Sequence, residues 1–385
     1  MSSTTTWLRA VRLLFLLEGL PGAALFTRMP EIRQALHVNT GVLGLVLIGG
    51  SMGALVSLIF SSRLIERWGT RRLIVLGFTL ASASGLLAAA SIATHLAVGL
   101  FVSYVLIGFF IAGADVALNL DGTVIEEQLG RSVMPGLHAG YSVGSLAAVG
   151  IATLAISQHF SLVAQTVIFA LVVGTIPVLL RHRLPPTTGR RLTHERTAES
   201  DSFRPWHDPI IVMLAIGLLG FTLAEGASND WLALAVVQGD HASHAAGGVA
   251  YACLMVAMVV TRVVGTRLVN RFGRVRVIRL LGLLGGSGIV LIAGSHSVLG
   301  ADVGATLWGL GIALAFPLFL SAAGESPHAA RSVPFVATAG YGASLVGPPL
   351  LGFLAQGVGI LSMLLLVGAL VFVASAFAKA TAPRT

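Results

Sequence analysis

Ionisable side chains inside long apolar runs are the residues of this sequence best suited to chemistry. Glu18, Asp115 and Glu225 each interrupt such a run. A charged carboxylate is costly in an apolar medium, so burial favours its protonated form. A carboxyl group that is alternately buried and wetted binds and releases a proton. We therefore predict that these three acids couple proton movement to another process.

Asp115 also begins a polar stripe along one predicted helix. Asn119, Gly122 and Glu126 follow it at intervals of four, three and four residues, which places all four on one helical face. Such a face can line a cavity and offer a titrating acid beside a hydrogen-bonding amide. The alternative is that Asp115 only forms a hydrogen bond between helices and has no chemical role.

Other polar and aromatic residues inside the apolar runs are candidates for contact with a bound solute. Aromatic rings can stack on a sugar-like ring, and the alternative for each is ordinary packing between helices. Arg262 lies near the end of its run, and we expect its side chain to extend toward lipid headgroups and not to bind an anionic solute. The predicted solute-binding residues are Asn119, His138, Tyr141, Ser142, Asn229, Asp230, Trp308 and Tyr341.

The sequence patterns of common enzyme classes are absent or misplaced. GYSVG at 140–144 matches a hydrolase serine pattern, but that pattern needs a strand-turn-helix and this copy falls inside an apolar run. No HExxH, phosphate-binding loop or dinucleotide-binding glycine pattern occurs. Cys253 is the only cysteine, which excludes a disulfide or a cysteine zinc site within one chain. We expect no enzyme activity, no cofactor and no metal.

The composition places most of the chain in a membrane. Of 385 residues, 55% are hydrophobic and 10% charged, with a mean hydropathy of +0.89, whereas soluble domains carry about 25% charged residues. A spanning helix needs roughly 20 apolar residues. The sequence predicts an all-α membrane protein with twelve transmembrane helices, near 8–30, 41–62, 73–94, 96–120, 133–157, 161–180, 209–235, 245–268, 275–294, 299–322, 332–355 and 358–379.

The polar breaks between these runs alternate in charge. If both termini face the cytoplasm, nearly all arginines of the breaks lie on that side, and only Arg28 and Arg33 lie on the other. The net charge of +8 then reflects contact with membrane lipids and not with nucleic acid. We expect a multi-pass protein of a bacterial-type inner membrane with both termini in the cytoplasm.

An internal repeat divides the chain into two halves. SRLIERWGTRR at 62–72 aligns without gaps on TRLVNRFGRVR at 266–276, and five positions are identical. Both copies follow the second apolar run of their half, and residues 182–208 form one long polar stretch between the halves. The predicted domains are an N-terminal six-helix bundle at 1–181, a cytoplasmic linker at 182–208 and a C-terminal six-helix bundle at 209–385.

The first copy resembles the loop signature of the major facilitator superfamily, Gly-x-x-x-Asp-Arg-x-Gly-Arg-Arg. It departs from the signature at three positions, where Ser62, Glu66 and Thr70 replace glycine, aspartate and arginine. The resemblance implies the major facilitator fold and a role for both loops in controlling a conformational change. The gating residues that it implies are Glu66, Arg67, Gly69, Arg71, Arg72, Asn270, Arg271 and Gly273.

Four shorter segments resemble the fucose permease branch or bacterial relatives of that branch. They are ADVALNL at 114–120, GLHAGYSVGS at 136–145, EGASNDW at 225–231 and TRMP at 27–30. The resemblance implies a secondary active transporter that works by alternating access as a functional monomer. The expected activity is proton-coupled uptake of a small polar, sugar-like solute, with Asp115 at the branch's proton site.

Two other functions stay open at this point. A proton-driven exporter of drugs or metabolites would share the fold, but such proteins carry a Gly-Pro-rich fifth helix, and here the GPP sequence is at 347–349 in the eleventh run. A membrane sensor that does not transport would usually carry a long cytoplasmic extension, and only six residues follow position 379.

Overall fold

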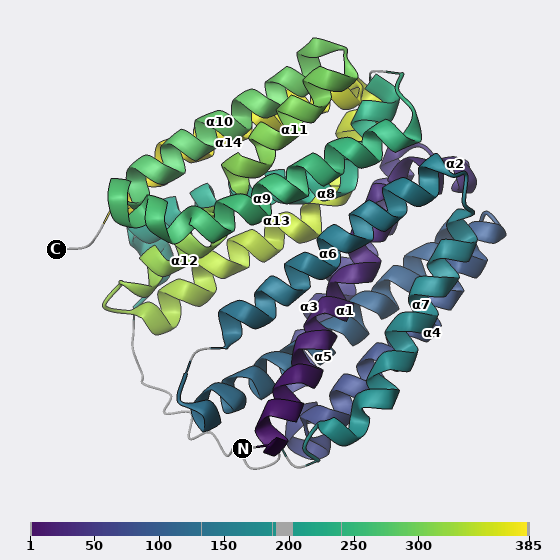
Figure 1. Ribbon diagram of the computed structural model, residues 1–385. Helices are drawn as coiled ribbons and strands as arrows, with labels where there is room; N and C mark the ends of the chain where they lie inside the picture. The colour runs from purple at the N-terminus through teal and green to yellow at the C-terminus, as the bar shows by residue number, and fades with distance from the viewer. Residues whose placement is uncertain (1, 132, 187, 190–202, 240, 383–385) are drawn as a thin grey trace. The chain divides into compact units, whose positions relative to one another are not determined.

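The computed structural model describes residues 2–131, 133–186, 188–189, 203–239 and 241–382. The described residues form helices and contain no β-strand. The helices are α1 Ser2–Thr27, α2 Met29–Leu36, α3 Thr40–Trp68, α4 Thr70–Ala93, α5 Ala97–Leu129, α6 Met134–Ser157, α7 Leu162–Leu180, η1 Arg181–Arg183, η2 Pro205–His207, α8 Pro209–Gly239, α9 His244–Phe272, α10 Arg274–Ser295, α11 Val298–Ile312, α12 Ala315–Gly324, α13 Ala329–Val358, α14 Ile360–Ala376 and η3 Phe377–Thr381 (Figure 1).

Eleven helices among the described residues are long and apolar enough to cross a membrane. The prediction of an all-α membrane protein is therefore confirmed. The eleventh predicted run, at 332–355, lies within α13, a helix that contains Pro334, Pro348 and Pro349 and is not one of these eleven spans. The tenth run spans α11 and α12, which together form one candidate span, Val298–Gly324.

The chain divides into two compact units. Unit 1 is Met1–Val38 with Leu45–Thr197, and unit 2 is Asn39–Gly44 with Ala198–Thr385. The first residues of α3 thus belong to unit 2 and the rest of that helix to unit 1. Residues 187 and 190–202 of the predicted linker lie outside the described residues.

Close packing of α1 on α6 is the main feature of unit 1 for function. A Cβ at Gly144 would clash with the carbonyl oxygen of Leu16, and one at Gly19 would clash with that of Tyr141, so glycine lets the two backbones touch. Helix α4 packs on α5 and α7. The core of this unit contains buried Leu14 and Phe15 from α1 and Phe78 from α4. This packing sets the positions of the polar residues on α1, α5 and α6.

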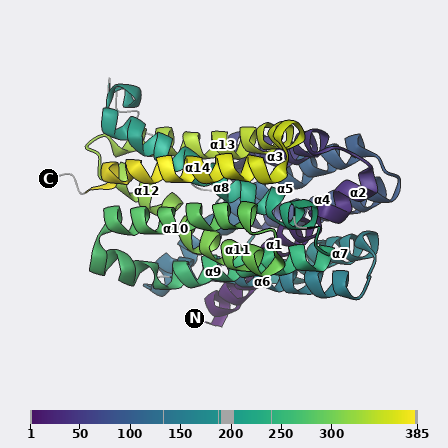
Figure 2. The same ribbon diagram turned by 90° about the horizontal axis from the view of Figure 1, so that it is seen from above.

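Unit 2 is built around α8, which packs against α9, α12, α13 and α14. Helices α10 and α14 lie side by side in this unit, as the two views show (Figures 1 and 2). Trp231 and Trp308 are fully buried in its core, together with Phe221 and Phe319. The face of α8 that is not covered by this core carries Glu225 and Asn229.

Candidate functional site

Unit 1 brings together four residues that the sequence singled out. Glu18 of α1 and Asp115 of α5 lie close enough for their carboxylates to repel each other, and His138 of α6 attracts Asp115 electrostatically. The Nδ2 group of Asn119 donates to the Asp115 carboxylate over 2.7 Å and to its backbone carbonyl over 2.9 Å. We call Glu18, Asp115, Asn119 and His138 the acid cluster.

The Glu18 carboxyl of the acid cluster is incompletely satisfied by hydrogen bonds. Oε2 of Glu18 is enclosed and has no hydrogen-bond partner among the described residues, and a buried charged oxygen without a partner is costly. The His138 ring packs edge-on against Phe15, with the ring centroids 5.3 Å apart. The cluster can therefore hold a proton on either carboxyl.

The remaining predicted residues of α6 and α5 lie beside the acid cluster. The Ser142 hydroxyl donates to the carbonyl of His138 over 3.2 Å, and Tyr141 is exposed. Further along the polar stripe, Glu126 accepts hydrogen bonds from the backbone of Val133 and Met134, over 2.6 and 2.9 Å. Glu126 therefore caps the start of α6, and only the Asp115–Asn119 part of the stripe belongs to the cluster.

Unit 2 contains a cavity of about 440 Å³ that gathers three of the predicted residues. Glu225 and Asn229 come from α8 and Tyr341 from α13. The sequence analysis did not assign the other lining residues to the site. They are Thr222, Gly226, Arg262, Phe316, Pro317, Gly340 and Ser344. The cavity combines an acid, an arginine, an amide and two aromatic rings, which suits a polar solute with a ring.

The contacts of Arg262 contradict the expectation that its side chain extends toward lipid headgroups. Its Nη2 lies 3.2 Å from Oε1 of Glu225, and its Nε donates to the carbonyl of Ala313 over 3.4 Å. Glu225 and Arg262 thus form an ion pair on the cavity wall. A second partnership orients the amide of Asn229, because the Tyr251 hydroxyl donates to its Oδ1 over 2.9 Å. Because Oδ1 of Asn229 is engaged, its amide nitrogen is the group that can donate to a bound solute.

Asp230 and Trp308 lie away from this cavity. Neither is among its lining residues, and both side chains are buried. Trp308 packs in the core where α11 crosses α10, and a Cβ at Gly288 would clash with its backbone nitrogen. The structure thus gives Trp308 a packing environment, which the sequence analysis had kept as the alternative.

The two copies of the loop signature share their backbone geometry. Gly69 and Gly273 both have φ of 78°, a value that L residues rarely adopt. The first copy has an exposed Glu66 with no ion pair to any described residue. In the second, Arg274 pairs with Glu325 over 2.6 Å, and the acid comes from the end of α12. Arg67, Arg72, Asn270 and Arg271 are exposed and Arg71 is partly buried.

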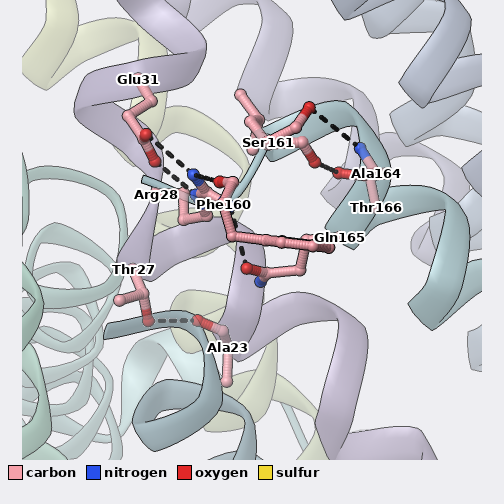
Figure 3. Close-up of polar contacts among 10 residues, drawn as sticks. Ala23, Thr27, Arg28, Glu31, Phe160, Ser161, Ala164, Gln165 and Thr166 are labelled. Atoms are coloured by element: carbon pink, nitrogen blue, oxygen red, sulfur yellow. Dashed lines mark hydrogen bonds and ion pairs between the residues drawn. The ribbon is translucent and has the colours of Figure 1, made fainter. Parts of the chain in front are cut away.

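Arg28 is a buried residue whose partners the sequence analysis did not predict. It lies between α1 and α2 and is 1% exposed. Its guanidinium donates to the carboxylate of Glu31, to Oε1 of Gln165 over 2.9 Å and to the carbonyl of Phe160 over 2.7 Å (Figure 3). The TRMP segment at 27–30 therefore holds the end of α1 against the start of α7.

Comparison with known proteins decides the family. Residues 13–343 match the family model described as the Major Facilitator Superfamily. The chain belongs to the Major Facilitator Superfamily. It is 31% identical over 362 residues to an uncharacterized MFS-type transporter of Yersinia pestis, covering 90% of this chain and 88% of the relative. It is 28% identical over 377 residues to the membrane protein MosC of Rhizobium meliloti, with 96% and 89% covered.

Solved structures of the superfamily share the fold. The nucleoside transporter NupG superimposes with a TM-score of 0.78 at 16% identity, with 100% of both chains covered. FucP in its outward conformation gives a TM-score of 0.62 at 16% identity, also with 100% of both chains covered. The protein is therefore a multi-pass transporter of this superfamily and not an enzyme.

Proposed function

We propose that this superfamily member takes up a small polar, sugar-like solute together with protons. The observation that carries the proposal is the acid cluster of unit 1, in which the carboxyl groups of Glu18 and Asp115 lie near each other and Asp115 also faces an imidazole and an amide. A proton shared by Glu18 and Asp115 removes their mutual repulsion and the cost of burying two charges. Closure of the site favours the protonated cluster, and its opening to water favours release.

The cavity of unit 2 supports the choice of a polar solute. Asn229 offers a fixed amide donor, and the Glu225–Arg262 pair offers an acceptor and a donor. Phe316 and Tyr341 supply rings that can stack on a sugar-like ring. We propose Glu225 as a further proton-coupling residue, because loss of its charge would release Arg262 to bind the solute.

The wider transport cycle follows the arrangement of the superfamily. We propose twelve transmembrane helices in two six-helix bundles, at 1–181 and 209–385. The bundles rock so that the solute site opens alternately to the two sides of the membrane. The bundles lie in a bacterial inner membrane with both termini in the cytoplasm, and one chain is the functional unit. The gating residues of the two loops control the rocking.

The test of this proposal is a solute screen on purified protein in liposomes. The panel contains neutral monosaccharides, polyols and nucleosides, the last because NupG is a nucleoside transporter. Uptake is measured with an inward proton gradient, with no gradient and with an outward gradient. Accumulation under the inward gradient alone supports proton-coupled uptake. Accumulation only under the outward gradient identifies an exporter, and transport indifferent to both gradients identifies a facilitator.

A further inference from the structure

A second cavity lies in unit 1, where the start of α1 meets the start of α4. It has a volume of about 580 Å³ and contains none of the proposed proton-coupling or solute-binding residues. Its lining residues come from four segments of the chain. They are Thr4, Thr6, Trp7, Arg71, Gln128, His182, Arg183, Leu184, Pro185 and Pro186.

The described lining of this cavity carries positive charge and no acidic side chain. Arg71 and Arg183 contribute two guanidinium groups and His182 an imidazole, and no aspartate or glutamate is among the lining residues. Neither arginine forms an ion pair with a described residue. Guanidinium groups attract anions, and their geometry suits the oxygens of phosphate.

Two helix N-termini add to this attraction. Helix α1 begins at Ser2 and helix α4 at Thr70, and neither has an acidic residue in its first turn. The start of a helix carries a partial positive charge, which favours an anion. Thr4 lies in the first turn of α1 and Arg71 in that of α4, so each helix start contributes a lining residue.

The wall of the cavity is held in place by hydrogen bonds. The Nε1 group of Trp7 donates over 2.9 Å to Oδ2 of Asp121, whose side chain is fully buried. The Thr4 hydroxyl donates to Oε1 of Gln128 over 3.0 Å, which leaves the amide nitrogen of Gln128 as a donor. The backbone N–H of Thr70 donates to the carbonyl of Thr188 over 3.0 Å and fixes the segment after η1. A site with such walls binds without first having to be ordered.

The internal repeat shows that Arg71 is not required by the loop itself. Val275 occupies the equivalent position in the second copy, whereas Arg72 has an equivalent arginine, Arg276. Arg72 is exposed and does not line the cavity, while the partly buried Arg71 does. The charge at position 71 therefore serves something particular to unit 1.

We propose that this cavity binds a phosphate-bearing anion, held by Arg71 and Arg183 with Gln128 and the start of α1 as further donors. The phosphate comes either from the headgroup of an anionic phospholipid or from a soluble phosphate ester. Trp7 supplies an apolar face for the carbon atoms next to the phosphate. The inference does not rest on the proposed transport function, although Arg71 is also one of the proposed gating residues.

The test uses the full chain in phosphatidylcholine nanodiscs and follows its melting temperature. One arm adds glycerol phosphate to the buffer, and the other raises the fraction of phosphatidylglycerol in the disc. A ligand that binds the folded state raises the melting temperature in a saturable way. The variants are Arg71→Gln and Arg183→Gln, and the matched control is Arg72→Gln, which removes the same charge from the neighbouring residue.

The wild type and Arg72→Gln are expected to saturate at the same ligand level. Arg71→Gln and Arg183→Gln should each need roughly tenfold more ligand to reach the same rise in melting temperature, because each variant loses one charge-assisted contact. Response to glycerol phosphate assigns a soluble ester, and response to phosphatidylglycerol alone assigns a lipid. The proposal is overturned if neither probe stabilises the wild type, or if all four proteins respond alike. Arg183 is exposed, so its variant keeps the test decisive even if Arg71→Gln folds poorly.

Discussion

At the scale of single residues, the acids were predictable and their partners were not. Glu18, Asp115 and Glu225 stand out because a carboxyl inside an apolar run is rare. Asn119 was predictable as well, since it lies four residues after Asp115 on one helix. The pairing of Arg262 with Glu225 depends on how α9 is rotated against α8, and the pattern along one helix does not contain that rotation.

The hydrogen bond from Tyr251 to Asn229 gives a prediction at this scale. Tyr251→Phe removes the donor, so the Asn229 amide loses its fixed orientation and the solute binds more weakly. The loss of one hydrogen bond, about 1 kcal/mol, should raise the solute dissociation constant roughly fivefold. Binding is measured on the purified protein with the solute found in the liposome screen.

The matched comparison for Tyr251→Phe is a double-mutant cycle with Asn229→Ala. Because the tyrosine acts through the amide, the double variant should bind as weakly as Asn229→Ala alone. Additive losses would show that Tyr251 acts on the cavity by some route other than Asn229.

At the scale of helices, the apolar runs predicted the elements well, because length and hydropathy suffice for a spanning helix. The contacts between helices were harder to predict. The glycines at 136, 140 and 144 have the spacing of a helix-packing stripe, yet a Cβ at Gly136 meets nothing within 4 Å and one at Gly144 would strike the backbone of α1. The spacing of residues identifies a face of a helix, and the position of the neighbouring helix determines how much of that face is in contact.

This difference within one stripe can be tested by substitution. Gly144→Ala should push α1 away from α6, lower the melting temperature and disturb the acid cluster, since overpacking costs about 1 to 3 kcal/mol. Gly136→Ala is the matched control and should melt as the wild type does. Equal melting temperatures for the two variants would contradict the close approach of α1 and α6.

Arg28 gives a second prediction about how the helices are held. Arg28→Lys keeps the charge but cannot contact Glu31, Gln165 and Phe160 together, because lysine lacks the planar fork of arginine. We expect low yield and a melting temperature several degrees below that of the wild type. Arg33→Gln changes an arginine whose side chain makes no hydrogen bond to a described residue, and it is expected to have the milder effect. The opposite order would show that the Arg28 contacts contribute little.

At the scale of the whole molecule, the arginine distribution predicts which ends of the helices face the cytoplasm. In a Cys253→Ala background the chain has no cysteine, so single cysteines can be added. Trp206→Cys, in the exposed polar stretch between the halves, should resist an impermeant thiol reagent on intact cells. Thr94 follows the last residue of α4, at the end of that helix opposite the first loop copy. Thr94→Cys should therefore react with the same reagent. Labelling at 206 and protection at 94 would reverse the orientation.

The central claim is that a titrating carboxyl in the acid cluster couples protons to solute movement. Asp115→Asn keeps the shape of the side chain and removes the proton that it carries. Uptake into liposomes is measured for this variant and the wild type, with an inward proton gradient and, separately, as exchange of solute across preloaded vesicles. The account predicts that Asp115→Asn exchanges solute like the wild type but no longer accumulates it against a gradient. Accumulation by Asp115→Asn equal to that of the wild type would contradict it.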